Sequence, residues 1–307
     1  MPKINLSRSI SINAPIDKVY QCVSDLGHWT IWSPWLITEP EAKVTLAEDH
    51  KSYSWEGNRT GSGNMKIAAE QTNQSIDLDL QFITPWKSTA KVRFDLVELN
   101  GGTQVTWHMD SSLPFFMFWF KKMMIAFIGM DYDRGLALLK DYSEDGKVHS
   151  KLDFEGINTY PGCQYIGIKN ECSIDLLGEK MAADFQHIGN YVADKNELIS
   201  GEALSIYHKW DIVNRVVVFT SAIPVKHIPK ELPEGYITGE IPSVKVYTLK
   251  HTGPYHHLGN AWTTLNSMYR NKEFKLNKKI FPFETYKNSP TEVPANELIT
   301  QIHFPIK

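Results

Sequence analysis

The chain has few cysteines and no run of basic residues, and each absence disfavours a class of protein. Only Cys22, Cys163 and Cys172 occur among 307 residues, without the spacing of a metal site. Cys163 and Cys172 could pair, but scattered thiols fit a reduced cytoplasmic setting better. The net charge of −3 disfavours a nucleic-acid partner, because binding to phosphates needs a basic surface.

Long apolar segments and a leader pattern are also missing. The most apolar stretch, 113–130, is interrupted by Lys121 and Lys122, and it is shorter than the roughly 20 residues that a membrane span needs. The first fifteen residues, MPKINLSRSISINAP, lack the basic-then-apolar pattern of a signal peptide. We therefore expect a cytoplasmic protein with no membrane partner and no nucleic-acid partner.

Recognisable catalytic motifs are absent as well. The sequence contains no Gly-rich phosphate loop, no Gly-x-Ser-x-Gly elbow and no identifiable Ser-His-Asp set. His256 and His257 are adjacent, so on a helix they point about 100° apart and make poor joint metal ligands. We predict no metal and no cofactor, and the sequence leaves open whether the protein is an enzyme.

What is present is enough apolar sequence for two domains. Hydrophobic residues make up 42% of the chain and aromatic residues 12%, and the length fits two domains of about 150 residues. The first half alternates short strand patterns with turns and closes with one long helix, from after Pro114 to about Tyr142. The strands are expected at 4–12, 52–56, 64–70, 75–82, 91–99 and 103–109, and a short helix at 16–24. This order predicts an α+β fold in which an antiparallel sheet wraps around the long helix.

The second half contains an internal repeat. Strands are expected at 164–171, 202–210, 215–223, 244–250, 282–286 and 297–305, and helices at 173–192 and 257–269. A duplicated strand-helix-strand-strand unit predicts two similar modules about a pseudo-two-fold axis, with a groove between them. The predicted domains are 1–145 and 163–307, joined by a polar linker at 146–162, and residues 226–242 form a Pro-rich crossover between the modules.

The first half carries motifs of a known superfamily. These are SINAPIDKVY at 11–20, Ser24-Asp25 followed by WTIWSPW at 29–35, GGTQVTW at 101–107 and GMDYDRGL at 129–136. Residues 3–145 thereby resemble the polyketide-cyclase-like (START-like) branch of the SRPBCC superfamily. The resemblance implies a helix-grip fold with an apolar cavity between sheet and helix, and its members range from lipid or hormone binders to enzymes.

The second half carries three spaced motifs of another family. They are HTGPY at 251–255, PFETY at 282–286 and ELITQIHFPI at 297–306. Residues 160–307 thereby resemble the GyrI-like effector-binding domain of multidrug-sensing regulators. In those regulators a DNA-binding helix-turn-helix is fused to the domain, whereas here an SRPBCC-like domain takes that place.

Glu284 is the central candidate for ligand binding. In a strand it shares one face with Tyr286, two residues on. An inward carboxylate loses hydration, which raises its pKa or recruits a cation, and aromatic rings add cation–π attraction of about 0.5–2 kcal/mol per contact. The resemblance implies that such a Glu contacts the ligand. A solvated edge carboxylate, or one paired with a structural Arg, is the alternative.

Aromatic side chains are expected to line this site. The candidates are Tyr255, Trp210, Tyr207, Phe219 and Trp262. For Phe219 and Trp262, ordinary core packing is the favoured alternative. Tyr255 follows Gly253-Pro254 at a strand-to-helix junction, where a polar ring tip can face a groove.

Three functions follow from these observations. The first is a protein that binds or senses an amphipathic or cationic organic molecule around Glu284. The second is a hydrolase of electrophilic small molecules with Glu284 and Tyr255 as catalytic groups, since the resemblance includes such hydrolases. The third is a carrier of lipids or other hydrophobic ligands in the N-terminal cavity.

Overall fold

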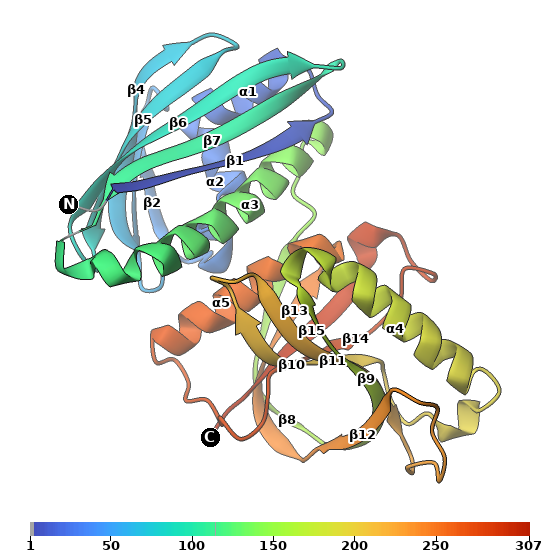
Figure 1. Ribbon diagram of the computed structural model, residues 1–307. Helices are drawn as coiled ribbons and strands as arrows, with labels where there is room; N and C mark the ends of the chain where they lie inside the picture. Colours follow the sequence, from blue (N-terminus) through green and yellow to red (C-terminus); the bar gives the residue numbers. More distant parts are fainter. Residues whose placement is uncertain (1–2, 114) are drawn as a thin grey trace. The chain divides into compact units, whose positions relative to one another are not determined.

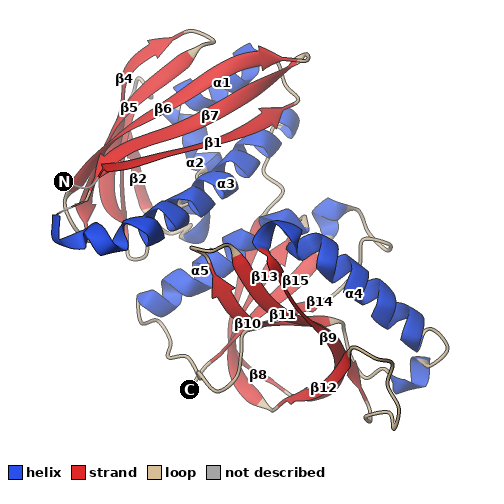
Figure 2. Ribbon diagram, in the orientation of Figure 1, coloured by secondary structure: helices blue, strands red, loops and turns tan. Residues whose placement is uncertain are grey.

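Two compact units make up the chain, Met1–Ser150 and Lys151–Lys307. The computed structural model describes residues 3–113 and 115–307 (Figure 1). Each unit contains one antiparallel sheet and its own helices, which confirms the predicted α+β class (Figure 2). Within the described residues, no helix is both long and apolar enough to cross a bilayer.

The first unit is a seven-stranded sheet in the order β1-β7-β6-β5-β4-β3-β2. The strands are β1 (Lys3–Ile12), β2 (Lys43–Leu46), β3 (Ser52–Gly57), β4 (Gly61–Gln71), β5 (Ser75–Thr84), β6 (Ser88–Leu99) and β7 (Gly102–Ser112). The helices are α1 (Ile16–Ser24), α2 (Leu26–Trp32) and α3 (Lys121–Asp145), with 3-10 turns η1 (Leu36–Thr38) and η2 (Phe115–Phe120). The long α3 packs along β1 and against α1 and α2, which is the predicted helix-grip arrangement.

Local sequence explains where these elements turn and end. Asn100 and Gly101 have positive φ angles of 53° and 79°, so they form the tight hairpin turn between β6 and β7. Gly146 ends α3 in the left-handed conformation, with φ of 74°. The predicted long helix begins at Lys121, behind η2, and Pro114 lies outside the described residues.

Aromatic rings fill the middle of the first unit, where the resemblance led us to expect a cavity. Trp107 is 1% exposed and stacks between Phe94 and Tyr132, with ring centroids 4.9 and 3.8 Å away. Trp29 and Trp35 meet the same ring edge-on. Offset and edge-on aromatic pairs each add stability beyond the area that they bury. The tryptophans of the first half therefore form a packed core at this level of the unit.

The second unit is an eight-stranded sheet in the order β12-β9-β11-β10-β14-β15-β13-β8. The strands are β8 (Lys151–Tyr160), β9 (Cys163–Ser173), β10 (Leu204–Asp211), β11 (Val216–Val225), β12 (Tyr236–Ile241), β13 (Val244–Thr252), β14 (Phe283–Tyr286) and β15 (Ile299–Pro305). The helices are α4 (Leu177–Val192) and α5 (Leu258–Arg270), with 3-10 turns η3 (Ile174–Leu176), η4 (Asn196–Leu198), η5 (Tyr255–His257) and η6 (Ala295–Glu297).

The predicted repeat is present and is larger than the sequence indicated. Its two copies run β8-β9-α4-β10-β11 and β12-β13-α5-β14-β15, and they meet in the middle of the sheet at the β10–β14 pair. The first strand of each copy pairs with the other copy, because β8 lies beside β13 and β12 lies beside β9. The copies therefore exchange their outer strands.

Both exchanged strands were missed in the sequence. Residues 146–162 were expected to be a linker, but 151–160 form β8, and the two units divide at residue 150. Likewise, residues 236–241 of the expected crossover form β12. Both are edge strands, which pair on one side and bury few side chains, so they lack the strong apolar alternation by which the other strands were recognised.

Candidate ligand-binding site

Glu284 lies at the centre of the second sheet. It belongs to β14 and is directly opposite Ser205 of β10, in the pair of strands where the two repeats meet. Its side chain is buried, with only 1% of the residue exposed. The site is therefore built on the axis of the repeat rather than on a loop, which gives it a rigid floor.

Three neutral groups donate hydrogen bonds to the Glu284 carboxylate. The indole Nε1 of Trp262 donates to Oε1 at 2.5 Å, and the hydroxyls of Tyr207 and Tyr286 donate to Oε2, each at 2.8 Å. Burial raises the pKa of Glu284, and this effect outweighs the hydrogen bonds, which lower it. All polar partners of this carboxylate among the described residues are uncharged.

The two tyrosines occupy equivalent positions of the two repeats. Ser205 and Glu284 face each other across the β10–β14 pair, and Tyr207 and Tyr286 each follow two residues later in their own strand. Because side chains two residues apart in a strand share a face, Tyr207 lies on the same face as Ser205, and Tyr286 lies on the same face as Glu284. The prediction that Glu284 and Tyr286 share a face is confirmed, and the repeat supplies Tyr207 by the same rule.

The helices above the sheet are related in the same way. The segments 166–178 and 247–259 align without a gap and share Lys169 with Lys250 and the pair Leu-Gly at the head of each helix. Continuing this alignment, Met181 of α4 corresponds to Trp262 of α5. The Met181 sulfur lies 3.9 Å from the Tyr207 hydroxyl. Each helix thus contributes one large side chain to the Glu284 site, from equivalent positions.

The site departs from symmetry at three positions that carry its chemistry. Glu284 corresponds to Ser205, Trp262 corresponds to Met181, and Tyr255 of η5 corresponds to Ile174 of η3. The second repeat therefore supplies the carboxylate, the indole donor and the phenol of Tyr255. The first repeat supplies the Tyr207 hydroxyl as a donor and otherwise packing surface.

Further aromatic rings surround the carboxylate. Trp210 stacks on Tyr207 with centroids 5.4 Å apart, and its buried Nε1 has no hydrogen-bond partner among the described residues. Tyr255 and Phe185 both meet the Tyr286 ring edge-on, at 5.7 and 5.6 Å. Tyr255 is 37% exposed and lies at the outer rim. Its pKa is raised by burial and by the charge of Glu284.

Most of the predicted lining residues come together here. Tyr207, Tyr286, Trp210, Trp262 and Tyr255 lie around Glu284 as described above. Phe219 is fully buried, lies directly opposite Tyr207 in the β10–β11 pair, and belongs to the same apolar cluster as Tyr207 and Trp262. We did not predict Met181, Phe185 or Ser205. Aligning the two repeats residue by residue would have found Met181 and Ser205, but nothing in the sequence marks Phe185.

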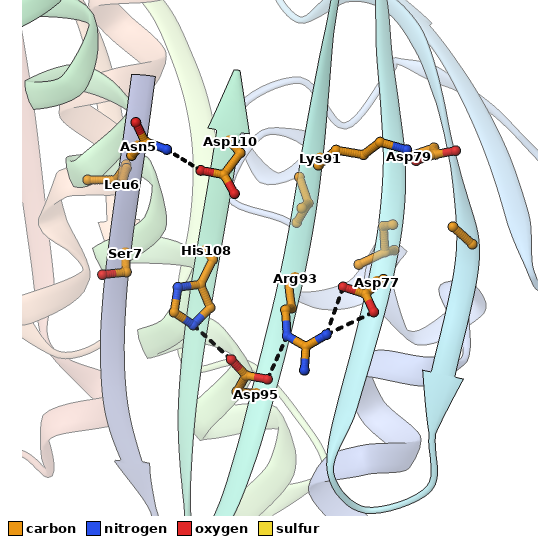
Figure 3. A pocket seen from close by; sticks show the side chains of 13 residues that line it. Asn5, Leu6, Ser7, Asp77, Asp79, Lys91, Arg93, Asp95, His108 and Asp110 are labelled. Carbon is orange, nitrogen blue, oxygen red and sulfur yellow. Dashed lines mark hydrogen bonds and ion pairs between the residues drawn. The ribbon is translucent and has the colours of Figure 1, made fainter. Parts of the chain in front are cut away.

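A polar hollow lies on the outer face of the first sheet. It has a volume of about 590 Å³, and charged side chains from β5, β6 and β7 line it (Figure 3). Arg93 pairs with Asp77 and Asp95, and Lys91 pairs with Asp79. Asp77 and Asp79 are thus partly exposed members of ion pairs. Exposed pairs of this kind contribute at most about 1 kcal/mol each, and their charges already balance in part.

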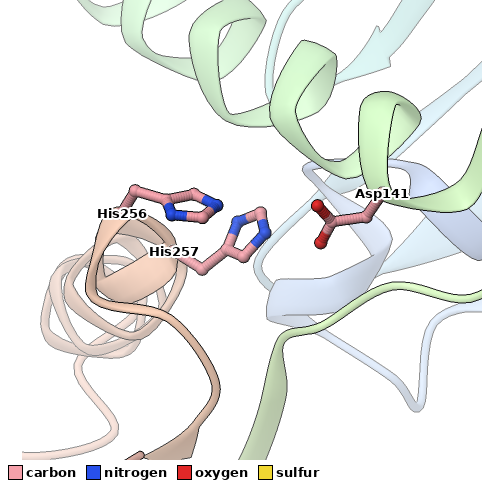
Figure 4. A group of neighbouring side chains, drawn as sticks. All are labelled: Asp141, His256 and His257. Atoms are coloured by element: carbon pink, nitrogen blue, oxygen red, sulfur yellow. The ribbon is translucent and has the colours of Figure 1, made fainter. Parts of the chain in front are cut away.

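His256 and His257 stand side by side in η5, with ring centroids 4.2 Å apart (Figure 4). Figure 4 also draws Asp141, which belongs to α3 of the first unit. Two histidines alone supply fewer ligands than the four that a structural zinc ion requires. The pair is therefore not taken as the functional site of the second unit.

Two family models match the chain. Residues 3–144 match the family described as "Polyketide cyclase / dehydrase and lipid transport", and residues 157–307 match the family described as "GyrI-like small molecule binding domain". No curated protein was found to match the chain.

Several solved structures show partial similarity. One is "Cryo-EM structure of EcmrR-DNA complex in EcmrR-RPo", with 18% identity, a TM-score of 0.43, and coverage of 61% of this chain and 68% of that chain. Another is "The structure of SAV2435 bound to TETRAPHENYLPHOSPHONIUM", with 14% identity, a TM-score of 0.39, and coverage of 50% and 94%. A third is the Aha1 dimer from Colwellia psychrerythraea, with 18% identity, a TM-score of 0.36, and coverage of 47% and 98%.

Proposed function

Because residues 3–144 belong to the polyketide cyclase/dehydrase and lipid transport family and residues 157–307 to the GyrI-like small molecule binding family, we propose that the second unit binds a lipophilic organic cation at Glu284. The observation that carries this proposal is a buried carboxylate whose partners are all neutral. An ionised group in such a place lacks a counter-charge, which is costly in a medium of low polarity. A bound cation would supply that charge.

The hydrogen bonds narrow the chemistry of the ligand. A carboxylate accepts about four hydrogen bonds, and Trp262, Tyr207 and Tyr286 already provide three. A ligand with several N–H donors would find little acceptor capacity left. A quaternary ammonium or phosphonium ion needs none, because it interacts through charge and through the faces of aromatic rings. We therefore expect permanently charged, apolar cations to bind best.

The exposure of the rings suggests where the ligand enters. Glu284 itself is covered, whereas Trp262, Trp210 and Tyr286 are half-buried and Tyr255 is 37% exposed. A ligand approaching from solvent would meet Tyr255 and Trp262 before the carboxylate. We expect the Trp262 indole to move when the ligand binds, because it covers Oε1.

The experiment compares two ions of nearly the same shape and opposite charge. Tetraphenylphosphonium and tetraphenylborate are titrated into the protein, with binding measured by calorimetry. The proposal requires tetraphenylphosphonium to bind more tightly and Glu284→Gln to weaken it by roughly tenfold or more. Glu171→Gln, which changes an exposed carboxylate of the same unit, is the matched control. Equal affinity for both ions, or an unchanged affinity in Glu284→Gln, would refute a charge-based site.

A hydrolase that uses Glu284 and Tyr255 is the second candidate. The raised pKa of Glu284 favours it, because a general base works best with a pKa near the operating pH. Against it, three of the roughly four acceptor positions of the carboxylate are already occupied, so little capacity is left to activate a water molecule. We rank binding first for this reason. The carrier function ranks third, because rings fill the middle of the first unit.

A further inference from the structure

One end of the first unit carries a cluster of exposed apolar side chains. Phe116, Phe118 and Trp119 of η2 are 73%, 63% and 67% exposed, and Met123 at the start of α3 is 37% exposed. Trp86, in the turn between β5 and β6, is 45% exposed. Such side chains seldom gather on a surface that faces only water. We call these five residues the aromatic tip.

The sheet register brings the members of the aromatic tip to the same end of the unit. The turn that contains Trp86 precedes β6, and β6 pairs with β7 so that Ala90 is opposite Ser111. β7 ends at Ser112 and leads into η2, while Lys3 of β1 lies opposite Ser112. Figure 1 shows the beginning of α3 near the N-terminal end of β1. Segments distant in sequence thus form one surface.

Four lysines lie in the segments that form or adjoin the aromatic tip. Lys3, Lys87 and Lys122 are exposed and Lys121 is half-buried, and no ion pair of these four lysines occurs among the described residues. The segments 80–90 and 111–130 contain no Asp or Glu. The aromatic tip is therefore surrounded by positive charge and complements a negatively charged surface.

The form of the aromatic tip distinguishes between kinds of partner. Its rings protrude, and a protein partner would need a matching pocket for each. The boundary between lipid headgroups and acyl chains accepts protruding rings without a shaped pocket, while lysines beside them contact anionic headgroups. The indole Nε1 of Trp119 donates to the Phe116 carbonyl oxygen at 3.1 Å, so its polar group stays paired when water is removed.

We propose that the aromatic tip docks the protein on a bilayer surface rich in anionic phospholipid. The six residues of η2 are far too few to cross a bilayer, so the contact is peripheral. The expectation of no membrane partner came from the absence of a spanning segment, and it does not address surface contact. This inference concerns the first unit and does not depend on the Glu284 site.

The test is co-sedimentation of the full chain with vesicles of phosphatidylcholine, with and without added phosphatidylglycerol. We expect binding to the mixed vesicles only, and weaker binding as salt is added. Phe116→Ser combined with Trp119→Ser, and separately Lys121→Glu combined with Lys122→Glu, should each lower the partition coefficient roughly tenfold or more.

The matched control uses exposed apolar residues at the other end of the same sheet. Val97 and Leu99 of β6 are 59% and 45% exposed, and Val97→Ser with Leu99→Ser should leave vesicle binding unchanged. An equal loss of binding in this control, or equal binding to neutral vesicles, would overturn the proposal. So would self-association that disappears in the Phe116 and Trp119 variant while vesicle binding is absent, since the surface would then join two copies of the chain.

Discussion

Tyr207 and Tyr286 occupy equivalent positions of two repeats, and both donate a 2.8 Å hydrogen bond to the same oxygen of Glu284. Each repeat thus contributes one tyrosine donor, and both donors bind the single carboxylate that the second repeat contributes. Burial raises the pKa of each tyrosine well above its ordinary value, as does the nearby charge of Glu284, so both remain donors at neutral pH.

The first prediction concerns these two donors. Tyr207→Phe and Tyr286→Phe should each lower the free energy of unfolding of the second unit by about 1.5–3 kcal/mol at neutral pH, because each removes a hydrogen bond to a charged group. Urea unfolding measures the loss. Tyr191→Phe is the control, since that hydroxyl bonds only a backbone carbonyl near the surface. Strictly additive losses in the double variant would contradict a shared carboxylate.

The second prediction is a pH dependence produced by Glu284. Its pKa is raised by folding, so the native state binds the proton more tightly than the unfolded state does. Wild-type stability should therefore fall relative to Glu284→Gln as the pH rises from about 4.3 through the folded pKa, by at most about 1.4 kcal/mol per pH unit. Unfolding of both proteins at several pH values measures this difference. A difference that stays constant with pH would refute a raised pKa.

The third prediction is the opposite behaviour at Glu39 of the first unit. Glu39 is 1% exposed and accepts hydrogen bonds from the backbone N–H groups of Asn58, Arg59 and Thr60. Burial raises its pKa, but these bonds lower it more, so the net shift is downward. Its stabilisation is present above the ordinary Glu pKa and is lost as the pH falls through the folded pKa.

Glu39→Gln should accordingly lower the free energy of unfolding of the first unit by about 1–3 kcal/mol at neutral pH. This loss should shrink below about pH 4. Glu48→Gln serves as the control, because Glu48 is an exposed carboxylate of the same unit. The pKa shifts of the two buried carboxylates, Glu39 and Glu284, then have opposite signs. A loss of stability in Glu39→Gln that grows toward low pH would contradict this account.

The fourth prediction separates binding from hydrolysis. Tyr255→Phe keeps the ring that meets Tyr286 and removes only the hydroxyl. If the site binds ligands without reacting with them, calorimetry should show unchanged affinity for tetraphenylphosphonium. If Tyr255 acts in hydrolysis, the same variant should abolish turnover of electrophilic small molecules by the protein. Turnover that persists in both Tyr255→Phe and Glu284→Gln would exclude the proposed catalytic pair.

The two-residue period of a strand correctly predicted that Glu284 and Tyr286 share a face. The groove between the two repeats stays a prediction. Met181 is marked in the sequence only by its alignment with Trp262 of the other repeat, and nothing in the sequence marks Phe185. The position of Phe185 depends on how α4 lies across the sheet, which is a property of tertiary packing.

The interior of the first unit could not be predicted from its motifs. Trp29, Trp35 and Trp107 suit either a cavity wall or a solid core, because both need large apolar rings. The choice depends on how closely Trp107, Phe94 and Tyr132 stack, and this distance is set by the positions of α3 and the sheet. Composition identifies the rings but leaves their spacing open.

The exchange of outer strands delays the pairing of β8 while the chain is being synthesised. β8 leaves the ribosome directly after the first unit, yet its partner β13 is made only after β9, α4, β10, β11 and β12 have been translated. Until then β8 is an unpaired strand, which is a hazard for association with other chains. Its exposed Lys151 and Glu155 and the positive φ of Gly156 make it a poor template for such pairing. The polar residues because of which β8 was predicted to be a linker thus also disfavour its pairing with other chains before β13 has been made.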